Sequence, residues 1–199
     1  TQVAKRFVDI VAAACAIFML SPVLLVTILL IKFEDGGDIF FRQKRVGRFG
    51  RLFGMWKFRS MVPNADKLKD QLLAQNEMKG GITFKMKDDP RITRIGRFIR
   101  KYSVDELPQF WNVLVGDMSL VGPRPAVPRE VQQYLVEDRQ RLLARPGLTC
   151  FWQVGGRSGI DFDGQVELDV RYIQSESFWL DIKLLFKTIP AVLKGDGAF

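Results

Sequence analysis

The strongest constraint in the sequence is a stretch of 22 residues without a charge, from Ile10 to Ile31. As a straight α-helix it would measure about 33 Å, which is enough to cross a hydrocarbon core of ~30 Å. It is also too apolar on all sides for an ordinary surface helix. No small-residue cleavage site follows it, which argues against a cleaved signal peptide. The stretch therefore predicts a helix associated with a membrane.

Two features of this helix argue against simple spanning. Ser21-Pro22 lies in the middle, where proline removes a backbone hydrogen bond and kinks a helix. Basic residues flank both ends, with Lys5 and Arg6 before it and a basic stretch at 42–59 after it. Since Lys and Arg prefer the cytoplasmic face, we expect a re-entrant helix that enters, bends and returns to the same side. A plain transmembrane anchor and a buried core helix are the alternatives.

Composition limits the chemistry. Lys and Arg total 30 against 22 Asp and Glu, a net charge of +8, which implies anionic partners. The chain has no histidine, so acid–base or nucleophilic work falls to carboxylates, Lys, Tyr or Cys, and a metal site would favour Mg²⁺ over Zn²⁺. Its two cysteines form neither a disulfide framework nor a metal-binding spacing, which fits a reducing compartment.

The rest of the chain predicts an α+β fold that is mainly helical. Residues 36–61 alternate aromatic residues with Gly and Arg and predict a small β-hairpin. Helices are expected from 64 to about 78 and over 128–144, the latter amphipathic and stopped by a Pro-Gly pair. The C-terminal stretch 177–195 predicts a helix with an aromatic face and several lysines. That face suits a membrane interface and core packing equally.

An acidic pair, Asp105 and Glu106, precedes an amphipathic helix expected at 107–116. One interpretation is structural, because Ser103 and Glu106 fit a capping box. Asp105 as N-cap would instead leave Pro108 in the first turn, where no N–H is needed. An ionised carboxylate at that place could also bind Mg²⁺ or attack phosphorus. Local pattern alone leaves these roles open.

Arginines near glycine and proline suggest a ligand for this pair. Pro123 and Pro125 hold the backbone of Arg124 stiffly, which suits bidentate phosphate recognition. Farther on, Arg145 and Arg157 lie next to Gly-rich turns whose N–H groups can approach an anion. Together these residues predict a carboxylate-plus-arginine site for a polyphosphate.

Four stretches, in order, resemble the bacterial sugar transferase family, the monotopic polyprenyl-phosphate phosphoglycosyl transferases: "KRFVDIVAA…LSPVLL", "QKRVGRFGRLFGMWKFRSM", "DPRITRIGRFIRKYSVDELPQFWNVLVGDMSLVGPRP" and "RPGLTCFWQVGGRS". The similarity runs from Lys5 to about Gly195. It implies a re-entrant membrane helix over 1–33, kinked at Ser21-Pro22, and a cytoplasmic catalytic domain over 34–199. The C-terminal stretches look closer to larger members of the family, so extra N-terminal transmembrane segments are expected in the parent protein.

The resemblance also implies a reaction. Such enzymes transfer a sugar-1-phosphate from a UDP-sugar to undecaprenyl phosphate and release UMP. The family's Asp-Glu dyad falls on Asp105 and Glu106. By that match Asp105 is the nucleophile, forming a covalent phosphosugar intermediate with Mg²⁺ bound to it. Glu106 supports it by handling a proton or orienting the acceptor phosphate. A carboxylate nucleophile needs no histidine.

The family's Pro-Arg-Pro motif matches Pro123-Arg124-Pro125, and its basic residue before the dyad matches Arg100. The full set expected to bind phosphate or nucleotide is Arg100, Arg124, Arg145, Arg157, Lys57 and Arg59. Departures from the usual pattern are small: Tyr102, Val104 and Cys150 stand where many relatives carry Thr, Leu and Gly. None of these touches the dyad.

The expected partners are a UDP-sugar with a hexose, undecaprenyl phosphate and membrane lipid at the cytoplasmic face of the bacterial inner membrane. Nucleic acid is not among them, and a homodimer is compatible with such a chain. Three alternatives differ in kind. A basic binding module would grip nucleic acid and lose affinity with salt. A scaffold of a polysaccharide assembly complex would leave the dyad idle. Another lipid-linked phosphotransferase or hydrolase would release inorganic phosphate or ignore the polyprenyl acceptor.

Overall fold

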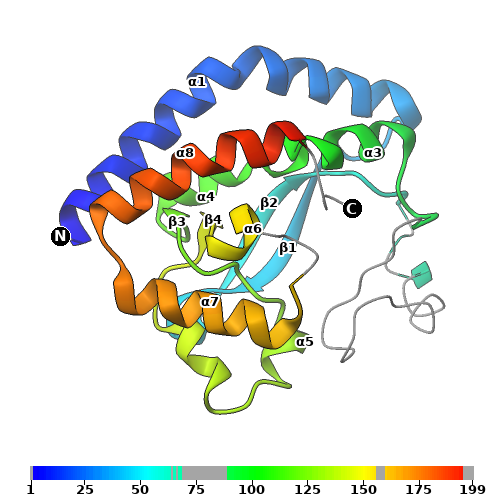
Figure 1. Ribbon diagram of the computed structural model, residues 1–199. Helices are drawn as coiled ribbons and strands as arrows, with labels where there is room; N and C mark the ends of the chain where they lie inside the picture. Colours follow the sequence, from blue (N-terminus) through cyan, green and yellow to red (C-terminus); the bar gives the residue numbers. More distant parts are fainter. Residues whose placement is uncertain (1, 64, 66, 69–88, 156–159, 195–199) are drawn as a thin grey trace.

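The computed structural model describes residues 2–63, 65, 67–68, 89–155 and 160–194 (Figure 1). The α-helices are α1 (Gln2–Asp35), α3 (Arg94–Lys101), α4 (Gln109–Val115), α5 (Pro128–Val131), α6 (Phe151–Gly155), α7 (Phe162–Ser175) and α8 (Phe178–Lys194). The strands are β1 (Phe40–Val46), β2 (Leu52–Phe58), β3 (Ser119–Val121) and β4 (Gly147–Thr149). Three 3-10 turns accompany them: η1 (Arg48–Gly50), η3 (Val104–Glu106) and η4 (Asp138–Leu142). The described chain is mainly helical with two small sheets, which confirms the predicted α+β class.

The apolar stretch forms one continuous helix, α1, which contains Pro22 and arches over the domain in Figure 1. Proline cannot donate to the carbonyl four residues earlier, which belongs to Phe18. The hydroxyl of Ser21 donates to this carbonyl at 2.8 Å and replaces the missing donor. The Ser-Pro pair thus keeps the helix hydrogen-bonded through the proline.

The N-terminal end of α1 is bonded to distant parts of the chain. Lys5 donates to the carboxylate of Asp181 and, at 2.7 Å, to the hydroxyl of Tyr172. Arg6 donates to the carbonyls of Val113 and Leu114 at the C-terminal end of α4. Helix-end carbonyls lack intrahelical partners, so a guanidinium there is stabilising.

The C-terminal end of α1 is attached to the same domain. The carboxylate of Glu34 accepts a hydrogen bond of 3.0 Å from the backbone of Ile95 in α3. Asp35 forms an ion pair with Arg59, just after β2. Both ends of α1 are therefore held by one folded unit.

Between these ends, α1 presents a broad apolar surface. Phe18 and Phe33 are 82 % and 83 % exposed, and most of the leucine, isoleucine and valine side chains between them are exposed or half-buried. By length and composition α1 could cross a membrane. Exposing this surface to water would be costly, since each buried CH₂ is worth ~0.8 kcal/mol.

Strands β1 and β2 form the predicted antiparallel hairpin, with Phe41 opposite Lys57 and Gln43 opposite Met55. Because side chains alternate along a strand, Gln43 and Arg45 lie on one face of β1. The turn between the strands uses left-handed backbone at Phe49 (φ 57°).

Packing fixes α3 close to the end of the hairpin. A Cβ on Gly96 would lie 2.0 Å from the carbonyl oxygen of Ser60, so only glycine allows this approach. Ile99 of α3 is buried with Phe58 of β2 and Ile31 of α1. These contacts fix the positions of the hairpin, α3 and α1 relative to one another.

The predicted helix at 128–144 is wrong. The chain forms only the single turn α5, a loop, and the 3-10 turn η4. Tertiary contacts explain the break: Tyr134 is buried against Phe162 of α7, and Arg141 pairs with buried Asp169. The helix expected at 64–78 lies outside the described residues, apart from Ala65, Lys67 and Leu68.

Helix α8 packs on the core, as one of the two interpretations of its sequence predicts, and also carries exposed aromatic residues. Leu184 is buried in the main core with Tyr172 of α7. Trp179 and Phe186 are 77 % and 70 % exposed on its outer side. The helix therefore packs on the domain with one face and leaves aromatic side chains outside.

Candidate active site

The acidic pair lies in η3, and neither acid caps a helix. Ser103 adopts a left-handed backbone (φ 55°), and its side chain makes no capping hydrogen bond. The N-cap position of α4 is occupied by Pro108. Both capping interpretations of Asp105 and Glu106 are therefore wrong. A left-handed non-glycine residue stores strain of about 1 kcal/mol, and such residues concentrate at functional sites.

Both acids line an open cleft of about 930 Å³. Its walls come from the hairpin, η3, the segment around Arg124, α6 and α8. This volume lies within the usual range for small-molecule sites. Four of the cationic side chains that line the cleft act electrostatically on the two acids: Arg45, Lys57, Arg100 and Arg124. Two carboxylates among four cations leave net positive charge, which suits a phosphorylated ligand.

Lys57 of β2 lies closer to Glu106 than to Asp105. Its Nζ lies 2.8 Å from Oε1 of Glu106 but 3.9 Å from Oδ2 of Asp105. Glu106 is therefore engaged by a charge-assisted hydrogen bond, whereas Asp105 has only a longer ion pair with the same lysine. The Asp105 side chain is 11 % exposed, so it is sheltered but reachable from the cleft.

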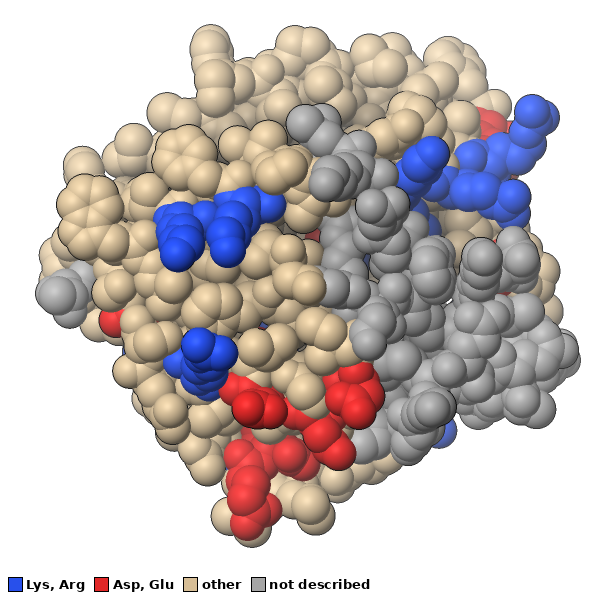
Figure 2. Space-filling model, viewed as in Figure 1, with Lys and Arg blue, Asp and Glu red and all other residues tan. Residues whose placement is uncertain are grey.

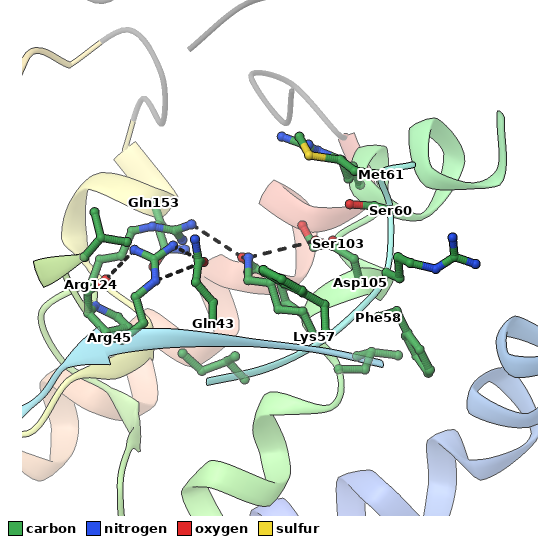
Figure 3. Close-up of a pocket in the computed structure, with 18 of the residues that line it drawn as sticks. Gln43, Arg45, Lys57, Phe58, Ser60, Met61, Ser103, Asp105, Arg124 and Gln153 are labelled. Atoms are coloured by element: carbon green, nitrogen blue, oxygen red, sulfur yellow. Dashed lines mark hydrogen bonds and ion pairs between the residues drawn. The ribbon is translucent and has the colours of Figure 1, made fainter. Parts of the chain in front are cut away.

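Arg124 completes the cluster on the other side of Glu106, with its guanidinium 3.5 Å from Oε1 of that residue. The same guanidinium lies 5.7 Å from the ring centre of Trp152 in α6, within cation–π range. Arg45 stands beside it and donates to the carbonyl of Pro125 at 2.9 Å and to Oε1 of Gln43. Figure 3 shows the Arg124 and Arg45 side chains grouped near Gln43, with Lys57 between them and Asp105.

The electrostatics separate the two acids. Burial raises the pKa of Asp105 to about 6, against the opposing effect of Lys57. Burial alone would raise the pKa of Glu106, but the charges of Lys57 and Arg124 outweigh this effect and lower the pKa of Glu106 to about 2. Burial, with the charge of Arg124, lowers the pKa of Arg45 to about 10. Asp105 is thus the more basic carboxylate, while Glu106 holds the surrounding cations.

The other residues expected to bind phosphate or nucleotide are distributed as follows. Arg100 lines the cleft. Arg59 also lines it, but its guanidinium is bonded to Asp35. Arg145 lies in a separate cavity of about 170 Å³ near Arg6, away from the acids. Arg157 lies outside the described residues.

Sequence reasoning missed Gln43, Arg45 and Trp152. The first two were visible in principle, because alternate residues of a strand share a face and both lie in "QKRVG". Trp152 gives no such signal. Its position under Arg124 depends on a contact between residues 28 apart along the chain.

The site can also be tested for a fit to Mg²⁺. No cluster of three or more Asp, Glu, Cys or His side chains occurs in the described residues. Mg²⁺ is commonly held by one or two carboxylates plus substrate phosphates and water, so such a cluster is not required. The carboxylate oxygens of Asp105 accept no hydrogen bond from a described residue, so they are available to coordinate a metal ion. The residues present fit a Mg²⁺ ion that a phosphorylated ligand would help to bind.

We expect Arg45→Met to lower kcat/KM about 10²-fold with little loss of stability. The bond from Arg45 to the Pro125 carbonyl positions the Pro-Arg-Pro segment, and a displacement of about 1 Å at a reacting group can cost that much. The matched control is Arg42→Met, which removes the same charge from an exposed position on the same strand. Equal losses in both variants would assign the effect to net charge rather than to positioning.

Comparison with known proteins identifies the family of the chain. Residues 1–195 match the family model described as bacterial sugar transferase. The galactosyl transferase CpsE of Streptococcus agalactiae serotype III is 50 % identical over 197 residues, covering 98 % of this chain and 43 % of that protein. The undecaprenyl-phosphate galactose phosphotransferase of Salmonella typhimurium is 46 % identical over 198 residues, covering 98 % and 41 %.

A shorter relative is covered more completely. The exopolysaccharide production protein ExoY of Rhizobium meliloti is 39 % identical over 199 residues, covering 98 % of this chain and 88 % of that protein. By contrast, the chain spans less than half the length of CpsE and of the Salmonella protein. With a family match over nearly its whole length and a relative covered almost end to end, the chain belongs to the bacterial sugar transferase family.

Proposed function

We propose that this chain transfers a sugar-1-phosphate from a UDP-sugar to undecaprenyl phosphate and releases UMP. The observation that carries the proposal is the unequal pair: a buried, basic carboxylate, Asp105, beside a carboxylate already held by cations, in a cleft with excess positive charge. The name of the Salmonella relative supplies the acceptor, undecaprenyl phosphate, and the sugar, galactose, and we take UDP-galactose as the first donor to test. The reaction would begin the assembly of an exopolysaccharide or capsule.

In the first step a carboxylate oxygen of Asp105 attacks the phosphorus that carries the sugar. The bond from this phosphorus to the bridging oxygen breaks, and UMP leaves with that oxygen. In the second step an oxygen of the lipid phosphate attacks the same phosphorus. The aspartyl–phosphorus bond breaks, giving lipid diphosphate-sugar and the free carboxylate. Splitting the transfer in this way is what covalent catalysis provides.

The neighbouring residues stabilise the negative charge that develops on the phosphoryl group and do not transfer a proton. Lys57 and Arg124 converge on Glu106, which fixes two cations at the point where phosphoryl charge develops. Phosphoryl transfer depends mainly on such positioning and charge stabilisation. The face of Trp152 limits the movement of the Arg124 guanidinium. Mg²⁺, when bound at Asp105 and the donor phosphates, would neutralise phosphate charge.

The re-entrant placement of α1 is part of the proposal. Both ends of the helix are bonded to one domain, through Lys5 and Arg6 at the start and Glu34 and Asp35 at the end. A helix that crossed the bilayer would place these ends on opposite sides, and a single folded unit could not hold both. We therefore propose that residues 1–33 dip into the cytoplasmic leaflet and that 34–199 stay at its surface, where the acceptor phosphate lies.

The decisive experiment is a burst of UMP in the absence of acceptor. Purified protein with Mg²⁺ is mixed with a panel of UDP-sugars, first UDP-galactose and UDP-glucose, and UMP is measured on the millisecond-to-second scale. A covalent mechanism predicts a burst stoichiometric with protein, and sustained turnover only after undecaprenyl phosphate is added. Direct transfer predicts no burst. Release of inorganic phosphate instead would favour a lipid-linked phosphatase.

The same burst has a predicted pH dependence. Because burial raises the pKa of Asp105 to about 6, the nucleophile is protonated below that pH and ionised above it. At limiting Mg²⁺ the burst rate is expected to rise with pH and level off above about 7, and saturating Mg²⁺ bound at Asp105 should move the rise to lower pH. Omitting the acceptor removes the titration of the lipid phosphate from the profile. Glu106→Gln should move the rise to lower pH, since the charge of Glu106 contributes to the raised pKa. A profile unchanged in that variant would contradict the coupling.

A further inference from the structure

Helix α3 carries an outward face that the proposed reaction does not use. It carries four exposed side chains, Arg94, Arg97, Phe98 and Lys101, of which the middle two each lie three or four residues from the first and from the last. Such spacing places them on one side of a helix. The opposite side, with Ile95 and Ile99, packs into the core. In the part of the chain that the structure describes, no carboxylate forms an ion pair with these three cations.

This face adjoins the exposed apolar surface of α1. The backbone of Ile95 donates to Glu34 at the end of α1, and Ile99 packs against Ile31. Phe33, 83 % exposed, lies on the last turn of α1. In Figure 2 the upper edge formed by α1 shows no charge along most of its length, and blue side chains gather at its right-hand end where Figure 1 places α3.

Acidic side chains form a larger group at the opposite end of this face, with some basic side chains beside them. Acidic side chains gather in the lower part of Figure 2, around α7. Exposed acids in that region include Glu137, Asp163 and Glu167. On the face drawn in Figure 2 the cations of α3 therefore lie beside the apolar helix, next to Glu34 and Asp35 at its end, and the largest group of acids lies at the opposite end. A bilayer with anionic headgroups would attract the cations of α3 and repel this group of acids.

We propose that the outward face of α3 is a docking surface for anionic phospholipid headgroups of the bilayer that holds α1. The inference rests on the membrane placement of α1 given under the proposed function. The arginine and lysine stems can extend toward the phosphates while Phe98 enters the boundary of the acyl chains. A headgroup contact here bears on the active site, because α3 leads directly into η3.

The link from lipid to site is short. Arg100, on the same helix, lines the cleft, and Tyr102 connects the two sides: its ring lies 5.1 Å from that of Phe98 and 5.5 Å from the ammonium of Lys101. Docking of α3 would thus fix the height of Asp105 relative to the headgroup layer.

The test uses tryptophan quenching in vesicles. A reporter is placed in the face by Phe98→Trp, with exposed Trp111 and Trp179 changed to Phe, and the signal of the remaining Trp56 and Trp152 is subtracted with the same protein carrying Phe98. The protein is reconstituted in mixed phosphatidylcholine and phosphatidylglycerol vesicles, with bromine on the acyl chains of one lipid or the other. We expect brominated phosphatidylglycerol to be preferred roughly fivefold at the reporter, the equivalent of ~1 kcal/mol, and the preference to shrink with salt.

The matched variants remove three charges from either side of the molecule. R94Q/R97Q/K101Q should abolish the preference, whereas R129Q/R139Q/R171Q, which changes exposed residues elsewhere, should preserve it. Equal quenching by both brominated lipids would overturn the proposal, as would no quenching by either. The measurement needs no turnover, so its failure is separate from a failure of UMP release.

Discussion

Asp105→Asn is expected to abolish the UMP burst and at the same time to raise thermal stability at neutral pH. Activity should fall at least about 10⁴-fold, since an amide cannot form the acyl phosphate and loss of a nucleophile is among the most damaging changes in an enzyme. The gain in stability arises because the folded protein holds this carboxylate in a buried place that disfavours its charge.

The stability effect has a definite sign and pH window. The pKa of Asp105 rises from 3.8 in the unfolded chain to about 6 in the folded protein. Ionisation therefore costs the folded state stability as pH rises from about 4, and the full cost is present above about 6. At 1.36 kcal/mol per pH unit this amounts to about 2–3 kcal/mol. Asparagine removes the cost, so its advantage should be largest above pH 6 and vanish near pH 4.

Two measurements check this prediction: burst amplitude, and apparent Tm between pH 4 and 8. Asp163→Asn is the matched control, with the same charge change at an exposed position of α7. It should leave the burst amplitude unchanged and should not raise Tm, since Asp163 lies in the first turn of α7, where a negative charge is stabilising. A variant at Asp105 that lost activity and stability together would indicate a structural role and contradict the nucleophile assignment. Retained activity would contradict it directly.

The sequence indicated the elements whose signals are local. A run of apolar residues predicts α1, alternation predicts the β1–β2 hairpin, and the spacing before Gly116 predicts α4. The acidic pair could be singled out, yet its surroundings could not. Asp105 meets Lys57 across 48 positions of the chain, and no periodic pattern predicts such a contact.

The basic residues at the start of α1 show why the long-range contacts could not be predicted from the sequence. Lys5 and Arg6 looked like charges that set membrane orientation, whereas their side chains bond to groups more than 100 residues away. The expected helix at 128–144 failed for a related reason. Burial of Tyr134 against Phe162 outweighs local helix preference there. Likewise, glycine-rich turns beside Arg145 suggested an anion site, but the fold places this arginine near Arg6.

Lys5→Met is expected to lower the apparent Tm by roughly 10 °C, with UMP release lost in proportion to unfolding. The ammonium of Lys5 is mostly buried and bonded to Asp181, Tyr172 and the carbonyl of Val121. Its removal leaves the carboxylate of Asp181 uncompensated. Breaking one partner of a buried ion pair costs about 3–5 kcal/mol, and each kcal/mol shifts Tm by about 2–4 °C at this size. Thermal melts of the detergent-solubilised protein measure the effect, with exposed Lys183→Met of α8 as control.

The double variant Lys5→Met/Asp181→Leu separates the loss of a contact from the burial of an unpaired charge. If the unpaired carboxylate dominates, removing both partners should recover most of the stability lost in the single variant. Lower pH should also narrow the deficit of Lys5→Met. Burial already raises the pKa of Asp181, and without Lys5 the folded state would take up a proton there more readily than the unfolded chain. A deficit that persists in the double variant and at low pH would mean that Lys5 acts through its bonds to Tyr172 and Val121. The attachment of α1 would then rest on those bonds rather than on the ion pair.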